Sequence, residues 1–201
     1  MSSHMVNENL FCALRNGFPA NLEAIAVETD DGLCYSWLDL ERGSAMMANW
    51  LRSLSLPEGS RIAVQVEKSV EVLMLYLATL RSGHVFLPLN PAYQANEMAY
   101  FMTNAEPAVV VCSGKNFGWV SKIAFQAGTR HVFTLNDDRT GSLLDRAAAQ
   151  TTRALSVSSS RPFACGDKAA PRPTTAIPIM GDAPRRNEWH WPALATTSDR
   201  P

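Results

Sequence analysis

The sequence predicts an α/β protein in which an N-terminal hairpin precedes parallel βαβ units, followed by a disordered tail. From residue 61 to 149, short apolar runs alternate with helical patterns at the spacing of βαβ units. One of these runs, AVVVC at 108–112, is wholly apolar, as strands covered on both faces are. After residue 150 no apolar period of 2 or 3.6 persists, and seven of the twelve prolines lie there.

The residues before 61 predict a helix, a hairpin and a second, longer helix. The individual elements are a helix over 7–18 capped by Asn7, strands over 24–29 and 33–35, and a helix from its cap Ser36 to Leu54. The turn signal DDG at 30–32 joins the two strands into a hairpin. The long helix is amphipathic, so one of its faces should lie against the core.

The residues from 61 onward predict four strands and four helices in alternation. The strands are expected over 61–66, 85–88, 108–112 and 130–135, and the helices over 69–81, 94–104, 116–127 and 141–149. The helix over 69–81 is apolar nearly all round, so it should be largely buried. Gly83 stands at the usual glycine position after a helix.

Composition excludes several classes of protein. The net charge of −1 provides no field that would recruit nucleic acid or an anionic membrane, and no apolar stretch approaches the roughly 20 residues of a membrane span. Residues 1–5 do not resemble a signal peptide and are expected to be a cloning remnant or a disordered start. The four cysteines, Cys12, Cys34, Cys112 and Cys165, have no C-x-x-C spacing. A cytoplasmic protein with incidental thiols is therefore expected.

Several residues invite a functional interpretation, and for each a structural one is favoured. His84 has no serine or cysteine nucleophile near it in the sequence, so it is expected to be a turn residue at the entrance to a strand. Glu67, Lys68 and Glu71 lie at a strand-to-helix junction, where charges suit the helix start and solvent.

Three further segments also allow both a functional and a structural interpretation. Pro88 is expected to shape a strand edge, whereas NPAY at 90–93 is either a feature of the architecture or the lining of a substrate cleft beyond parallel strands. The tail mixes Arg185 and Arg186 with the WHW sequence at 189–191, which is too little to indicate single-strand nucleic-acid binding.

Two stretches of the body resemble a known family. YSWLDLE at 35–41 is similar to the first core motif of the adenylate-forming enzymes, and LATLRSGHVFLPLN at 77–90 is similar to their second. EKSVE at 67–71, and NPAY at 90–93 with Asn96 and Glu97, sharpen the likeness toward malonyl-CoA synthetases. AEPAVVVC at 105–112 continues it.

The resemblance implies the N-terminal part of the adenylate-forming fold over residues 6–150. It also implies an AMP-forming acid–thiol ligase, which joins ATP and a carboxylate to an acyl-adenylate and then passes the acyl group to CoA. In such enzymes ATP, Mg²⁺ and CoA act with malonate or a similar small carboxylate, in fatty acid metabolism. A Thr/Ser/Gly-rich phosphate loop followed by lysine is due shortly after residue 155, and residues 150–201 contain none.

The chain is therefore expected to be a truncated acyl-CoA synthetase, inactive alone, with no catalytic, cofactor-binding or metal-binding residue of its own. Residues 151–201, rich in Pro, Ser and Arg, are expected to be a disordered tail or the product of a frame change. The alternative is a non-catalytic interaction protein that uses its partial sheet and tail. In either case the helix over 69–81 and the strand over 108–112 should lack part of their cover, and exposed sheet edges should favour self-association.

Overall fold

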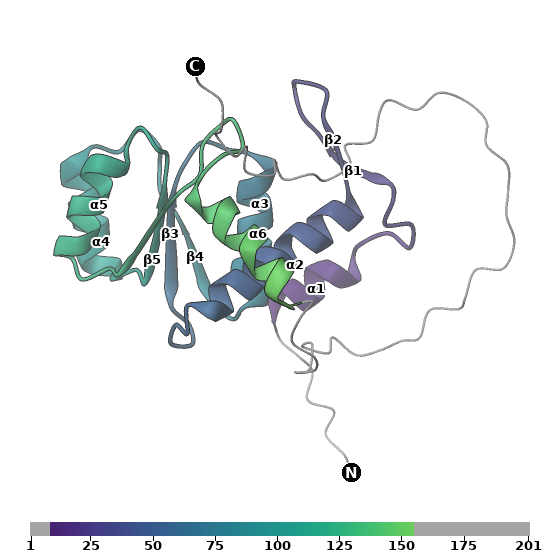
Figure 1. The fold of residues 1–201 in the computed structure, drawn as a ribbon, viewed down its shortest axis with the longest axis horizontal. Coiled ribbons are helices and arrows are strands. Elements are labelled where there is room, and N and C mark those ends of the chain that lie inside the picture. The colour runs from purple at the N-terminus through teal and green to yellow at the C-terminus, as the bar shows by residue number, and fades with distance from the viewer. Residues whose placement is uncertain (1–8, 155–201) are drawn as a thin grey trace, which may run out of the picture.

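A computed structural model describes residues 9–154, which form a three-layer α/β/α arrangement with a hairpin beside it (Figure 1). The main sheet has four parallel strands in the order β4-β3-β5-β6, and the hairpin pairs β1 with β2 antiparallel. The strands are β1 (Ile25–Glu28), β2 (Cys34–Ser36), β3 (Arg61–Gln65), β4 (Val85–Pro88), β5 (Val109–Cys112) and β6 (His131–Thr134). The helices are α1 (Leu10–Asn16), α2 (Trp37–Ser53), α3 (Val70–Arg81), α4 (Ala95–Ala105), α5 (Phe117–Gln126) and α6 (Ser142–Ala154).

The strand order explains why helices cover both faces of the sheet. The chain leaves β3 for β4 on one side and then returns past β3 to β5 on the other. Because crossovers between parallel strands are right-handed, reversing the direction of travel places the connecting helices on opposite faces. The two apolar clusters follow this division: α2, α3 and α6 pack on one face, and α4 and α5 pack on the other.

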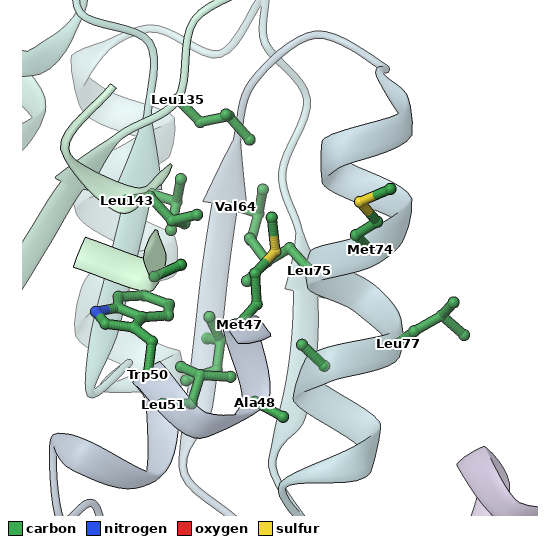
Figure 2. Packing of buried hydrophobic residues seen from close by; sticks show 14 of the residues in the cluster. Met47, Ala48, Trp50, Leu51, Val64, Met74, Leu75, Leu77, Leu135 and Leu143 are labelled. Carbon is green, nitrogen blue, oxygen red and sulfur yellow. The ribbon is translucent and has the colours of Figure 1, made fainter. Parts of the chain in front are cut away.

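The larger cluster lies between α2, α3, α6 and the sheet. Figure 2 shows Met47, Val64 and Leu75, from α2, β3 and α3, directed toward one another. Trp50 packs edge-on against Phe133 of β6, with 4.9 Å between ring centroids. The long amphipathic helix thus buries its apolar face as its sequence pattern predicts.

Helix ends follow local sequence signals. Ser36 caps α2 in a reciprocal capping box, in which its hydroxyl accepts from Asp39 N at 3.1 Å and Asp39 Oδ2 accepts from Ser36 N at 2.8 Å. After α3, Gly83 has φ +75°, and His84 N donates to Thr79 O at 3.0 Å. This geometry is a Schellman motif and confirms the predicted helix end.

The cap predicted for the first helix is wrong. The helix begins at Leu10, and its cap is Asn9, whose Oδ1 accepts from Phe11 N at 2.8 Å. Asn7 lies outside the described residues. Asn9 is the favoured cap because its Nδ2 also donates to Leu80 O of α3 at 2.9 Å. The local sequence pattern does not reveal this tertiary contact.

A carboxylate of α2 holds the three helices of the N-terminal part together. Glu41 pairs with Arg15 of α1 at 2.7 Å and with Arg81 of α3 at 3.0 Å. The Arg81 guanidinium also lies 4.5 Å from the ring centroid of Phe11. These charged contacts therefore hold α1, α2 and α3 together at the edge of their apolar contacts.

The expectation of missing cover is wrong for the third parallel strand, because all four residues of β5 are fully buried. It holds in part for α3. Seven of its twelve residues are buried, whereas Leu73 is 37% exposed. The last helix, predicted to end at 149, continues to Ala154, past the boundary expected at residue 150.

Gly43 sets how closely α2 approaches α3. A Cβ at this position would overlap Met74 Sδ and stand 3.1 Å from Met74 Cε. We expect Gly43→Leu to lower the free energy of unfolding by about 1–3 kcal/mol through overpacking. Gly118→Leu is the matched control: its Cβ would enter open space on α5, so we expect a gain of about 0.5–1 kcal/mol from helix propensity. Urea denaturation measures both, and equal effects would contradict the close-approach argument.

Candidate functional site

The carboxyl edge of the parallel sheet is the candidate site. Ligands of open α/β sheets bind beyond the carboxyl ends of the strands, where neighbouring strands send their chains to opposite faces. Here that point lies between β3, which ends at Gln65, and β5, which ends at Cys112. Gln65 and Cys112 are opposite one another in the ladder.

Gln65 anchors the loop that follows β4. The side chain is 1% exposed, and its Nε2 donates to Tyr93 O at 3.1 Å. Its Oε1 is buried with no hydrogen-bond partner among the described residues. Asn90 begins the same loop, and its Oδ1 accepts from Ala92 N at 2.9 Å. The NPAY segment at 90–93 is therefore held at the carboxyl edge, where the sequence pattern allows a cleft lining.

The loops after β5 and β6 are joined to each other. Gly114 N donates to Asn136 Oδ1 at 2.7 Å, and Asn136 N donates to Thr140 O at 2.8 Å. A Cβ on Gly114 would come within 2.9 Å of Asn136 Oδ1, so a larger residue here would displace the Asn136 side chain. Ser113 is 7% exposed, and its Oγ has no partner in the described part of the chain.

The buried oxygens of Gln65 and Ser113 do not form one site. Residues of β5 alternate between the two apolar clusters, Val111 in one and Cys112 in the other, so Ser113 continues on the face of Val111. Gln65 lies on the same face of β3 as Ala63, and Ala63 belongs to the apolar cluster that contains Cys112. The two side chains thus lie on opposite faces of the sheet.

A tyrosine–carboxylate pair joins the hairpin to α3. Tyr35 Oη donates to Glu71 Oε1 at 3.0 Å, and the two residues are 7% and 4% exposed. Burial, followed by the Glu71 carboxylate, raises the pKa of Tyr35 from 10.0 to about 12. The expectation that Glu71 faces solvent is therefore wrong. It lies at the helix start, as expected, but it is buried because β2 packs over it and supplies a donor.

The hairpin tip lies beside the loop that follows β6. Arg139 pairs with Asp31 at 2.5 Å. The Thr29 hydroxyl, and then Arg139, lower the pKa of Asp31. Because this pair is exposed, it contributes little to stability and mainly sets the position of the loop.

The other residues singled out in the sequence lie apart from one another. His84 directly precedes β4 at the amino edge of the sheet, which confirms it as a turn residue at the entrance to a strand. Burial lowers the pKa of the His84 imidazole, and the charge of Arg52 lowers it further, so the ring is neutral near pH 7. Glu67 and Lys68 are exposed beyond β3, as expected, and Pro88 ends β4. Arg185, Arg186 and residues 189–191 lie outside the described residues.

Two features are absent from the described residues. No group of three or more His, Cys, Asp or Glu residues among them could hold a metal ion. No helix among them is long and apolar enough to cross a bilayer. A groove of about 520 Å³ lies at the amino edge, lined by residues 54–57, 106–108 and 127–131. We favour the carboxyl edge as the site, because the strand topology places the diverging loops there.

Sequence reasoning missed Gln65, Ser113 and Asn136. Gln65 carries a usable signal, since it is the one polar residue inside an otherwise apolar run, IAVQV at 62–66. Ser113 and Asn136 follow predicted strands directly and could have been found from their positions at strand ends. Their hydrogen-bond partners depend on the tertiary structure.

Comparison with known proteins defines the class. Residues 16–182 match the family model described as AMP-binding enzyme, so the chain belongs to the AMP-binding enzyme family. The fold is the N-terminal part of the adenylate-forming fold, and the chain is related to acyl-CoA ligases of that superfamily.

Particular relatives agree with this assignment. The structure of MatB from Rhodopseudomonas palustris superimposes with a TM-score of 0.67 and 43% identity, over 71% of this chain and 28% of that one. The medium-chain fatty-acid–CoA ligase of Escherichia coli (strain K12) is 30% identical over 84 residues, 42% of this chain and 15% of that protein. Tyrocidine synthase 3 of Brevibacillus parabrevis is 33% identical over 89 residues, 44% of this chain and 1% of that protein. The chain thus spans less than a third of the length of each.

The Tyr35–Glu71 pair makes a prediction about mutations. Tyr35→Phe leaves the buried carboxylate without its donor, so we expect a loss of about 1–3 kcal/mol in the free energy of unfolding. Adding Glu71→Leu should restore much of that loss, because both polar partners are then removed. Tyr100→Phe is the control, since Tyr100 is 64% exposed and its change should stay within about 0.5 kcal/mol. Additive effects of the two buried substitutions would rule out the coupling.

The same pair makes a prediction about pH. Between pH 10 and about 12 the unfolded Tyr35 loses its proton while the folded one keeps it. Stability is therefore fully present below pH 10 and should fall by up to about 1.4 kcal/mol per pH unit through this window. Urea titrations from pH 9 to 12 measure the slope. Tyr35→Phe should remove this contribution, and an unchanged slope in the variant would contradict the assignment.

Proposed function

We propose that the chain is the N-terminal segment of an AMP-forming acyl-CoA synthetase. The observation that carries this proposal is the agreement between its two core motifs and its fold. The motif at 77–90 forms the end of α3, the Gly83 turn and β4, and the motif at 35–41 forms the Ser36-capped start of α2. Identity of 43% with MatB over this region supports it.

Our proposal for the substrate is malonate or a similar small carboxylate. It rests on the likeness of residues 67–71 and 90–97 to malonyl-CoA synthetases. The loop at 90–93, anchored by Gln65 at the carboxyl edge, supports a role in shaping the cleft. ATP, Mg²⁺ and CoA would serve the complete reaction. The free thiols of Cys12, Cys34 and Cys112 support a cytoplasmic location.

We further propose that the 201-residue chain does not form acyl-adenylates by itself. Adenylation needs donors and cations around the phosphates of ATP. The sequence holds no Thr/Ser/Gly-rich loop with a following lysine after residue 150. We therefore propose no residue of this chain as a ligand of the nucleotide and assign no step of the reaction to one.

The division at residue 150 also stays a proposal. The body would comprise residues 6–150, and residues 151–201 would add nothing to its stability. The family match runs to residue 182, so the test must include the tail. Shortening the chain after Ala154 should leave the urea midpoint unchanged, whereas a lower midpoint would assign the tail a structural part.

An activity test separates the family assignment from the activity of the isolated chain. We expect no malonate-dependent ATP–pyrophosphate exchange by the purified chain, because the phosphate-binding groups are missing. We expect a chimera in which residues 9–150 replace the matched segment of MatB to form acyl-CoA with the acid that MatB itself uses. The Gln65→Leu chimera should be less active, since the loop at 90–93 loses its anchor. Exchange by the isolated chain, or an inactive but folded chimera, would contradict the proposal.

The interaction-protein alternative is favoured by one observation: among the described residues, β4 pairs with a strand on one side only. This alternative assigns no role to the adenylation motifs, so it predicts that the chimera is inactive.

A further inference from the structure

The loop that connects β6 to α6, residues 136–141, is joined to other parts of the molecule at two points. Its Asn136 Oδ1 accepts a hydrogen bond from Gly114 N, in the loop directly after β5, at 2.7 Å. Its Arg139 pairs with Asp31 at the tip of the hairpin, at 2.5 Å. The loop therefore links the carboxyl edge of the sheet to a hairpin residue 108 positions earlier in the chain.

The two charged groups of the hairpin contact are directed toward each other by their neighbours. The Asp31 carboxylate accepts from the Thr29 hydroxyl with one oxygen and from Arg139 with the other. The carboxylate of Asp138, next to Arg139 in the chain, accepts from Thr140 N at 3.1 Å. Because the adjacent carboxylate is engaged within the loop, the Arg139 guanidinium pairs with the hairpin instead.

Hydrogen bonds inside the loop connect its two contact points. Arg139 N donates to Asn136 O at 3.1 Å, and Asn136 N donates to Thr140 O at 2.8 Å. The Asn136 side chain also donates from Nδ2 to Thr140 Oγ1 at 3.0 Å. A change of the backbone at Arg139 therefore reaches Asn136 directly.

The residues on either side of the loop are fixed independently of the hairpin. Leu135 N donates to Cys112 O of β5 at 3.0 Å, which continues the parallel ladder. Thr134 N donates to Ser142 Oγ at 3.0 Å, which fixes the start of α6. A movement that begins at the hairpin contact is therefore confined to residues 136–141 and the groups bonded to them.

A weak contact holds the backbone of Arg139 in a disfavoured conformation. Its φ is +63°, in the left-handed region where residues with a branched or long side chain are uncommon. The Arg139 and Asp31 side chains are 40% and 55% exposed, and exposed ion pairs are weak and screened by salt. Loss of the pair therefore leaves Arg139 free to leave the left-handed region.

We propose that the hairpin tip is a salt-sensitive latch on the loops at the carboxyl edge of the sheet. While the Asp31–Arg139 pair is formed, the loop over 136–141 keeps Asn136 bonded to Gly114. When the pair breaks, Arg139 relaxes and the Asn136–Gly114 hydrogen bond loosens with it. Because Gly114 lies at the candidate site, the latch changes the shape of that site. The latch involves no step of acyl-adenylate formation, so it goes beyond the proposed function and does not depend on it.

Amide hydrogen exchange of the full 201-residue chain, resolved by NMR, tests the latch. At low salt we expect Asp31→Asn to speed exchange at the Gly114 amide about 2- to 5-fold, as the loss of one exposed ion pair predicts. Asp30→Asn is the matched control, since it removes the same charge from the neighbouring exposed position and should leave Gly114 unchanged. The Leu135 amide should keep its wild-type rate in both variants, which shows that the fold is intact.

Salt and two substitutions of Arg139 test the physical cause. In about 1 M salt the wild-type chain should match Asp31→Asn at Gly114, because the pair is screened. Arg139→Ala removes the pair but keeps a disfavoured backbone, whereas glycine adopts the left-handed region freely. We therefore expect the Gly114 amide to exchange more slowly in Arg139→Gly than in Arg139→Ala, and salt to change neither rate.

Each contrary result overturns the latch. An unchanged Gly114 rate in Asp31→Asn, or an equal effect of Asp30→Asn, removes the ion pair as its cause. Faster exchange at Leu135 together with Gly114 means that the substitution weakens the whole fold and that no local latch exists. Equal rates in the two Arg139 variants remove the left-handed backbone from the account. None of these results uses the chimera, so the latch and the proposed function fail separately.

Discussion

The need to bury β5 on both faces governs the arrangement of the molecule. Its four residues are apolar and fully inaccessible, so neither face tolerates solvent. One layer of helices cannot cover both faces of the sheet. Because the strand order reverses direction after β4, the helices that follow lie on the other face and form the second layer. Gly43 then lets α2 lie close against α3, and Trp50 and Phe133 close the layer at β6.

The same reversal creates the candidate site. At this edge the loops leave neighbouring strands for opposite faces, where open α/β sheets bind their ligands. Gln65 holds the loop after β4, and the Gly114–Asn136 contact joins the loops after β5 and β6. The polar groups at this edge form hydrogen bonds with the backbone of the loops. This suits the proposed reaction, which needs held phosphates and an oriented acid more than a protein nucleophile.

The family match and the proposed lack of activity rest on different observations. Residues 16–182 match the family model, whereas the proposal of inactivity rests on the absence of a Thr/Ser/Gly-rich stretch with a following lysine after residue 150. The Glu41 and Tyr35–Glu71 contacts hold the hairpin and the first helices in place.

Periodicity and local caps determined the elements of this protein. The strands and helices lie within a few residues of their predicted bounds, because signals such as Ser36 and Gly83 act within one turn of backbone. Only the tertiary structure decided which polar residues are buried. Glu71 follows a helix start that suits solvent, yet a tyrosine thirty-six positions earlier in the chain covers it. The sequence alone resolved the family resemblance and the local fold, while the loops joined at the carboxyl edge depend on contacts between distant segments.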